Sequence, residues 1–235
     1  MLSTVKPGIL ITASAFPNPP FDSLVDGVRS GFDIELMHAI CKELGLQLQT
    51  VTYTGTNFTG IFDGLANRVY DAVASGTAIT PERARAALFS KPYLEFGQGV
   101  AVNRLAHPNV RSADNLKGLV AGVQQGTTAV EVARKLVANG ILASITYYAY
   151  DRITQALDDL EANRIGLIIK PHPTICELVK GRPKLAVPIE IPTDEKLGIA
   201  FARDNTQLCN AVNEALDRIR ANGVITDLQQ RWITS

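Results

Sequence analysis

The hydrophobic positions change their period along the chain, and these changes predict alternating strands and helices. Gly8 to Ala13 is a short apolar run, and Leu46 to Tyr53 alternates apolar and polar residues, so both are expected to be strands. One helical face between them carries the apolar residues Leu36, Met37, Ile40, Cys41 and Leu44. Gly45 follows as a C-cap. With a short helix over Ile61–Arg68 and a strand over Asp71–Ala74, the β-α-β-α-β order predicts a parallel sheet covered by helices on both faces.

The same alternation starts again in the second half of the chain. Further strands are expected over Gly99–Asn103, Gly118–Val123, Ile145–Tyr150, Ile165–Ile169 and Leu197–Arg203. Helices are expected to begin at Thr127-Thr128 and, with Asp151 as N-cap, before Ile153. The prolines from Pro188 to Pro192 indicate a crossover between elements, and two helices end the chain.

The pattern therefore predicts an α/β protein of two lobes, each a mostly parallel sheet flanked by helices. Residues 1–97 and 193–235 form lobe 1 and residues 98–192 form lobe 2. The chain crosses between them near Gly97 and near Pro192, and the two crossings form a hinge pair. The proline-rich loop after the first strand, the Asn57-Phe58 loop and the Ser75 loop all follow carboxyl ends of strands, where open α/β sheets bind ligands.

Composition narrows the function classes. The chain carries 23 basic and 23 acidic residues, and this balance argues against binding to nucleic acid. Three cysteines without metal spacing, and no visible metal cluster or phosphate loop, predict no metal and no cofactor; Cys41 and Cys209 are expected in the core. Residues 1–8 lack the apolar core of a signal peptide, so we expect an export signal already removed, an excised segment, or a cytosolic protein.

The segment from Ser75 to Arg83 combines three features that bind anions. A loop of small residues exposes backbone N–H groups, and a helix start after Thr80 adds the positive end of its dipole. Arg83 adds a planar set of donors suited to a carboxylate. A second anion cradle, Gly126-Thr127-Thr128, opens another predicted helix, so we expect one ligand held between two lobes.

Five segments, in order and at matching spacing, carry a family resemblance. They are Gly31–Leu36, Asp71–Arg83, Phe89–Tyr93, Gly122–Thr128 and Ala211–Trp232. Through them nearly the whole chain resembles the polar amino-acid branch of the bacterial solute-binding proteins (solute-binding protein family 3), the receptors that feed ABC importers. The resemblance implies a periplasmic-binding-protein fold, no catalysis, a periplasmic or extracytoplasmic location, a monomer, and an ABC permease as partner.

The resemblance also implies roles for single residues. Arg83 pairs with the α-carboxylate of the ligand, helped by N–H groups near Thr77 and Ala78 and by the N–H and hydroxyl of Thr128. Phe16 and Phe58 enclose the ligand side chain. The full expected ligand-binding set is Arg83, Thr77, Ala78, Gly76, Thr128, Thr127, Phe16, Phe58, Gln124 and Lys170. Without the resemblance, each residue also has a structural explanation. Arg83 is compatible with an exposed position in the first turn of a helix, and Thr127 and Thr128 are compatible with a helix N-cap. Phe16 and Phe58 are compatible with the hydrophobic core.

One position departs from the family pattern. Where the family usually has an aspartate for the ligand's ammonium, this chain reads Lys170-Pro171-His172-Pro173, and Pro171 cannot accept a salt bridge. A carboxylate ligand with a second anionic or carbonyl group, or a blocked or secondary amine, therefore fits better than a standard α-amino acid. The alternative is that Asp22, Glu95 or Asp151 supplies the negative charge, with Lys170 a solvated lysine at a strand end and His172 a loop residue.

Three functions are compatible with these observations. The first is a receptor that captures a small carboxylate or amino-acid-like ligand between two closing lobes and delivers it to an ABC importer. The second is the ligand-sensing module of a membrane receptor. The third is a dehydratase acting on a cyclic carboxylate, which needs a general acid that Lys170 to Thr174 does not offer.

Overall fold

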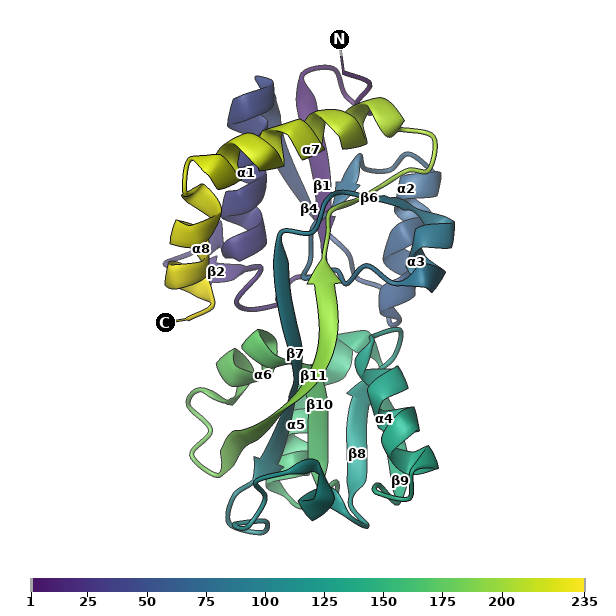
Figure 1. Cartoon of the computed structure of the whole chain (residues 1–235), viewed down its shortest axis with the longest axis vertical. Helices are drawn as coiled ribbons and strands as arrows, with labels where there is room; N and C mark the ends of the chain where they lie inside the picture. Colours follow the sequence, from purple (N-terminus) through teal and green to yellow (C-terminus); the bar gives the residue numbers. More distant parts are fainter. Residues whose placement is uncertain (1, 235) are drawn as a thin grey trace. The chain divides into compact units, whose positions relative to one another are not determined.

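The computed structural model describes residues 2–234, which group into two compact units. Within the described residues, unit 1 consists of the chain up to Thr54, Thr59–Glu95, and the chain from Glu195 onward. Unit 2 consists of Gly55–Phe58 and Phe96–Asp194. The boundaries fall inside two long strands, β7 (Leu94–Asn103) and β11 (Leu185–Leu197), which lie next to each other in one sheet (Figure 1).

Unit 1 is built on a five-stranded sheet with the order β4-β1-β5-β12-β6. Its strands are β1 (Ile9–Ser14), β4 (Gln47–Thr52), β5 (Ala72–Val73), β6 (Leu88–Phe89) and β12 (Ala200–Phe201). β1 runs parallel to β4 and β5, whereas β12 runs antiparallel to β5 and β6, so the sheet is mixed around a parallel centre. Because Thr12 and Ala13 pair with Ala72 and Val73, the loops that follow β1 and β5 leave the same edge.

Helices cover this sheet. They are α1 (Phe32–Leu44), α2 (Asp63–Ala66), α3 (Pro81–Ala86), α7 (Thr206–Ala221) and α8 (Val224–Trp232), with a 3-10 turn η1 (Phe58–Phe62). α1 packs against α7 and α8 (Figure 1), most of its predicted apolar face is buried, and Gly45 ends it with a left-handed φ of 66°. Cys41 and Cys209 are both buried, as expected of core cysteines. None of the helices within residues 2–234 has the length and apolar character needed to cross a membrane.

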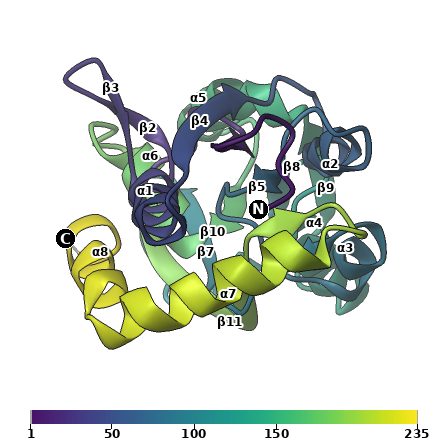
Figure 2. The ribbon, with the colours of Figure 1, turned by 90° about the horizontal axis from the view of Figure 1, so that it is seen from above.

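A short hairpin between β1 and α1 was not predicted. It pairs β2 (Ser23–Val25) with β3 (Val28–Ser30) and extends outward beside α1 (Figure 2). Its turn residues Asp26 and Gly27 have φ values of 51° and 76°, the combination that a tight two-residue hairpin turn requires. The Asp-Gly dipeptide was therefore a readable signal for this hairpin.

Unit 2 is built on a sheet with the order β11-β7-β10-β8-β9. Besides β7 and β11, its elements are β8 (Val120–Gln124), β9 (Ser144–Tyr148), β10 (Leu167–Pro171), α4 (Ala129–Ala138), α5 (Ile153–Glu161), α6 (His172–Val179), η2 (Ala113–Leu116) and η3 (Tyr150–Arg152). β8 runs parallel to β9 and β10, and β10 runs antiparallel to β7. Leu167 and Ile169 face a core shared with α4, whereas Ile168 faces a core shared with α5 and α6, as the two-residue period of a strand requires.

Pro188 and Pro192 lie inside β11, an edge strand of the described sheet, and prolines are tolerated in edge strands. The chain passes from unit 2 to unit 1 within this strand, between Asp194 and Glu195. Three other local expectations in this unit were wrong. Asp151 lies in η3, and Arg152 precedes α5 without a side-chain cap. His172 begins α6, and Lys170 is a buried member of β10 instead of a solvated residue at its end.

Candidate ligand-binding site

In unit 1, Arg83 lies against the loop that follows β5. The N-cap Thr80 accepts a hydrogen bond from the Arg83 backbone N–H at 3.1 Å, which fixes the first turn of α3. The guanidinium is buried, donates from Nη1 to the carbonyl of Ala78 at 3.0 Å, and lies 5.7 Å from the centre of the Phe62 ring. The loop and the arginine therefore form one group, and Arg83 is not a solvated surface residue.

Asp33, at the start of α1, holds this loop in place. Its carboxylate accepts hydrogen bonds from the Gly76 N–H at 2.6 Å and from the Tyr93 hydroxyl at 2.7 Å. Burial raises the pKa of Asp33 to about 7, although both hydrogen bonds act in the opposite direction. The Gly76 N–H is thus engaged within the protein, and Gly76 contributes to the site by shaping the loop.

Gly76 could not be replaced without strain. Its φ is +57°, and a Cβ atom would lie 2.8 Å from Cδ2 of Phe21. The next residue, Thr77, is fully buried, and its carbonyl accepts a hydrogen bond from Gly198 at 3.0 Å. The Thr77 hydroxyl has no hydrogen-bond partner among residues 2–234, an exception to the rule that buried polar groups are paired.

The Phe16 loop is tied to the same edge of the sheet. Ser75 accepts a hydrogen bond at its hydroxyl from the Ala15 N–H at 3.0 Å and one at its carbonyl from the Asn18 amide at 3.2 Å. The Arg29 guanidinium lies 5.0 Å from the centre of the Phe16 ring. Arg29 is held by an ion pair in which its Nε lies 2.8 Å from Oδ1 of Asp22.

In unit 2, the two threonines lie at the start of α4. Thr127 donates from its hydroxyl to the Gln124 carbonyl at 2.8 Å, which closes the turn between β8 and α4. Thr128 has helical φ and ψ and accepts a hydrogen bond at its hydroxyl from Nε2 of Gln98 at 3.1 Å. Gln98 is fully buried on β7, opposite Pro171 in the register of β7 with β10.

Lys170, Gln124, Tyr150 and Phe58 form a second group in unit 2, here called the lysine cluster. Lys170 Nζ donates to Oε1 of Gln124 at 2.6 Å and lies 5.5 Å from the centre of the Tyr150 ring. The Gln124 amide nitrogen donates to the Tyr150 carbonyl, so the amide oxygen is turned toward Lys170. The ring of Phe58 packs on that of Tyr150 with centroids 5.1 Å apart.

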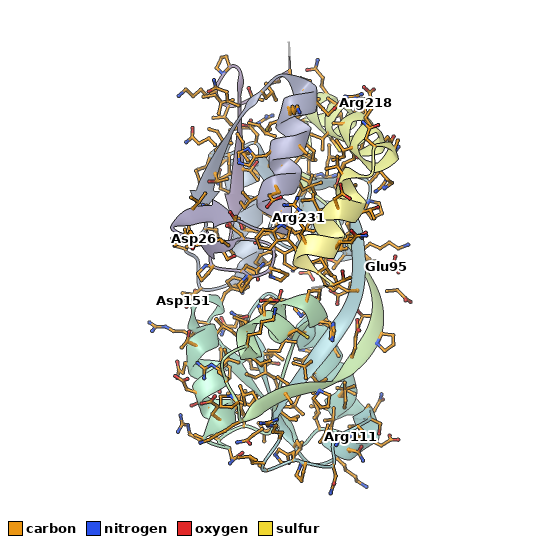
Figure 3. The ribbon with its side chains drawn as sticks, turned by 90° about the vertical axis from the view of Figure 1, so that its left-hand side faces the viewer. Asp26, Glu95, Arg111, Asp151, Arg218 and Arg231 are labelled. Carbon is orange, nitrogen blue, oxygen red and sulfur yellow. The ribbon has the colours of Figure 1, made fainter. Side chains whose placement is uncertain are left out.

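Three carboxylates were considered as sources of negative charge for an ammonium group of the ligand. Asp22 is paired with Arg29 within unit 1. Glu95 and Asp151, labelled in Figure 3, are both exposed. Oδ2 of Asp151 lies 3.6 Å from Nε of its neighbour Arg152. Burial lowers the pKa of Lys170 to about 8, the direction expected for an ammonium removed from water without a carboxylate partner.

Comparison with known protein families supplies the identification. The model of the bacterial extracellular solute-binding proteins, family 3, matches residues 10–235 of this chain. The chain belongs to this family. It is therefore a solute-binding protein. Membership of this family favours a binding function over the dehydratase activity considered above.

Individual relatives cover most of this solute-binding protein. ABC transporter arginine-binding protein 1 of Escherichia coli (strain K12) is 32% identical over 220 residues, which are 91% of this chain and 86% of the relative. L-cystine-binding protein TcyJ of the same strain is 28% identical over 235 residues, 99% and 85% of the two chains. Among solved structures, an ancestral arginine-binding protein bound to arginine has a TM-score of 0.85 at 28% identity, covering 96% of this chain and 98% of the other. This match confirms the predicted two-lobe α/β fold class.

The ten residues named from the sequence separate into two groups. Gly76, Thr77, Ala78 and Arg83 lie together in unit 1, and Phe16 is on the adjacent loop. The unit 2 group contains Thr127, Thr128, Gln124, Lys170 and Phe58. Sequence reasoning missed the supporting residues Asp33, Arg29, Gln98 and Tyr150. Only Asp33 lay in a segment that carried the resemblance.

Proposed function

We propose that this solute-binding protein captures a small carboxylate of the amino-acid class outside the cytoplasm and delivers it to an ABC importer. Unit 1 supplies the carboxylate-binding group Thr77, Ala78 and Arg83. Unit 2 supplies Thr128 and the lysine cluster. A ligand that binds one arrangement of the units better than others shifts the population toward it, and a permease can read that change.

The observation that carries this proposal is a buried guanidinium against a loop whose buried Thr77 hydroxyl has no partner among residues 2–234. Arg83 lies against the loop that contains Thr77, and the Thr77 Oγ1 makes no hydrogen bond within residues 2–234. A carboxylate removed from water needs such donors, because unmet hydrogen bonds cost several kcal/mol. The rest of the loop is fixed by Asp33, so the donors are oriented before the ligand arrives.

The names of the relatives support the ligand class. The relatives include proteins named for arginine and for cystine, and both compounds carry an α-carboxylate. The α-carboxylate is thus the chemical feature that this proposal takes from them.

A thermal-shift screen tests the proposed function. Purified protein is melted with a panel of amino acids, N-acyl amino acids, and mono- and dicarboxylates, because a ligand that binds the folded state raises the melting temperature. We expect stabilisation only by compounds with a free carboxylate, and none by the matching amides and amines. Stabilisation by the amide as well as by the acid would contradict the carboxylate assignment.

A further inference from the structure

Cys176 differs from the other two cysteines of this protein in its surroundings. Cys41 and Cys209 are buried, whereas Cys176 on α6 is partly exposed. Its Sγ lies 3.5 Å from Nε2 of His172, which precedes it by one turn of the same helix. A thiol within hydrogen-bond reach of an imidazole is the first half of the arrangement that activates a nucleophile.

The other ring nitrogen of His172 faces a carboxylate. Nδ1 lies 3.7 Å from Oε2 of Glu190 on β11, and Oε1 of Glu190 accepts a hydrogen bond from the Gly97 N–H at 2.8 Å. The carboxylate favours the tautomer with its proton on Nδ1, which leaves the Nε2 lone pair for the thiol. Cys176, His172 and Glu190, here called the thiol relay, all belong to unit 2. They have the order of nucleophile, base and orienting group.

Two glycines of β7 leave space for the thiol relay. A Cβ atom at Gly97 would meet the Ile191 carbonyl oxygen and would lie 3.0 Å from Cγ of Glu190. One at Gly99 would lie 3.2 Å from Cδ2 of His172, besides a closer contact with another residue of α6. Neither glycine has a positive φ, so the backbone conformation does not require glycine at either position. The absence of side chains on this part of β7 therefore gives His172 and Glu190 their positions.

The charges around Cys176 decide how it can react. Burial and the carboxylates Glu177 and Glu190 raise the pKa of the Cys176 thiol, whereas Lys180 acts in the opposite direction. Little thiolate is therefore present at pH 7, and the thiol needs a base at the moment of attack. His172 lies within reach as that base. The side chains of His172 and Glu190 are 35% and 42% exposed, so a small molecule can approach the thiol relay.

We propose that Cys176 is a site of reversible modification by small disulfides, with His172 as the base and Glu190 as a positioning residue. The thiol proton passes to Nε2 of His172 while Sγ attacks one sulfur of the disulfide. The sulfur–sulfur bond of the small molecule breaks, a new one forms to Cys176, and the leaving thiolate takes the proton from His172. Cys176 is thereby oxidised, and half of the small disulfide is reduced to a free thiol. This site does not depend on the proposed function.

Mass spectrometry of the intact protein measures this reaction. The full chain is incubated at pH 7 with cystamine, a small disulfide, and the mixed disulfide is followed with time. Cys176→Ser should abolish the product, because the two other cysteines are buried. His172→Gln should slow the reaction at least about tenfold, since a positioned base typically contributes about 10²–10⁴-fold.

Two carboxylate variants separate the thiol relay from a simple effect of charge. Both Glu177 and Glu190 raise the pKa of the thiol, so charge alone predicts a faster reaction in Glu177→Gln and in Glu190→Gln. The thiol relay predicts a faster reaction in Glu177→Gln and a slower one in Glu190→Gln, because the Glu190 carboxylate faces His172. The two variants remove the same charge, and the thiol relay requires opposite changes in rate.

Three results would overturn the proposal. They are an unchanged product in Cys176→Ser, equal rates for the unmodified protein and His172→Gln, and a faster reaction in Glu190→Gln. No reaction of the folded, unmodified protein with cystamine would overturn it as well. If thermal melts show that His172→Gln does not fold, the opposite changes expected for Glu177→Gln and Glu190→Gln decide.

Discussion

Replacing Lys170 by methionine should make the ligand-free protein more stable at pH 7. Burial lowers the pKa of Lys170 from its usual 10.5 to about 8. At roughly 1.4 kcal/mol for each pH unit, holding the charged form in the folded protein costs about 3 kcal/mol. Methionine has a similar length and flexibility, and it fills irregular apolar space without a charge.

Part of this gain is offset. The variant loses the hydrogen bond from Lys170 to Gln124 Oε1, and a hydrogen bond to a charged group contributes about 1.5–3 kcal/mol while a stranded acceptor costs about 1–3 kcal/mol. The Gln124 oxygen can regain water if the site is open to solvent, which limits this loss. With the oxygen rehydrated, a gain of about 3 kcal/mol less a loss of about 1.5–3 kcal/mol leaves a net increase of about 0–1.5 kcal/mol in the free energy of unfolding at pH 7.

The pH dependence identifies the cause. Below pH 8 the folded protein carries the full cost of the charge. Between pH 8 and 10.5 the unfolded chain still binds a proton that the folded protein has released, so the stability of the unmodified protein rises with pH relative to that of Lys170→Met.

Urea denaturation at pH 7 and pH 9.5 measures both quantities, with Lys117→Met as the matched control. The advantage of Lys170→Met should shrink or reverse at the higher pH, by up to about 2 kcal/mol. A variant that is less stable at pH 7 by the same amount as at pH 9.5 would refute the reasoning, because the lysine would then be neutral or compensated in the folded state.

Three further predictions concern other parts of the two groups. Gly76→Ala should lower the free energy of unfolding by about 1–3 kcal/mol in urea titrations, because its φ of +57° and the Phe21 ring at 2.8 Å leave no room for a Cβ atom; equal stability would mean that the loop can move. The raised pKa of Asp33, about 7, should make stability fall as pH rises from 4 to 7, and thermal melts of Asp33→Asn should lack this fall. Pro171→Asp should improve the binding of ordinary α-amino acids in calorimetry, since it returns a carboxylate beside Lys170; no gain across a panel would place the ammonium contact elsewhere.

The features that sequence reasoning recovered are those written in local patterns. The helix over Phe32–Leu44 follows from the helical spacing of its apolar residues. Its end follows from Gly45, because glycine readily adopts the left-handed conformation of a C-cap. The loop from Ser75 to Arg83 was recognisable because a strand, small residues and a helix start follow each other directly along the chain.

The features that it missed depend on contacts between distant residues. Asp33 supports Gly76 from 43 positions away, and nothing near either residue indicates the pairing. From the sequence alone, Pro188 and Pro192 argue against a strand. They are compatible with β11 because β11 lies at the edge of its sheet, and the strand order cannot be predicted from local sequence. Lys170 reads as a solvated strand end until Gln124 and Tyr150, from two other segments, are seen to surround it.

The central claim is that Arg83 binds the carboxylate of the ligand, and titration calorimetry of Arg83→Met tests it most directly. The ligand is the compound that stabilises the unmodified protein most in the thermal-shift screen, and Arg85→Met is the control, because Arg85 is an exposed arginine of the same helix. We predict that Arg83→Met weakens binding by about 2–5 kcal/mol, while Arg85→Met leaves it within about 0.5 kcal/mol. Equal affinity of the two variants would contradict the account.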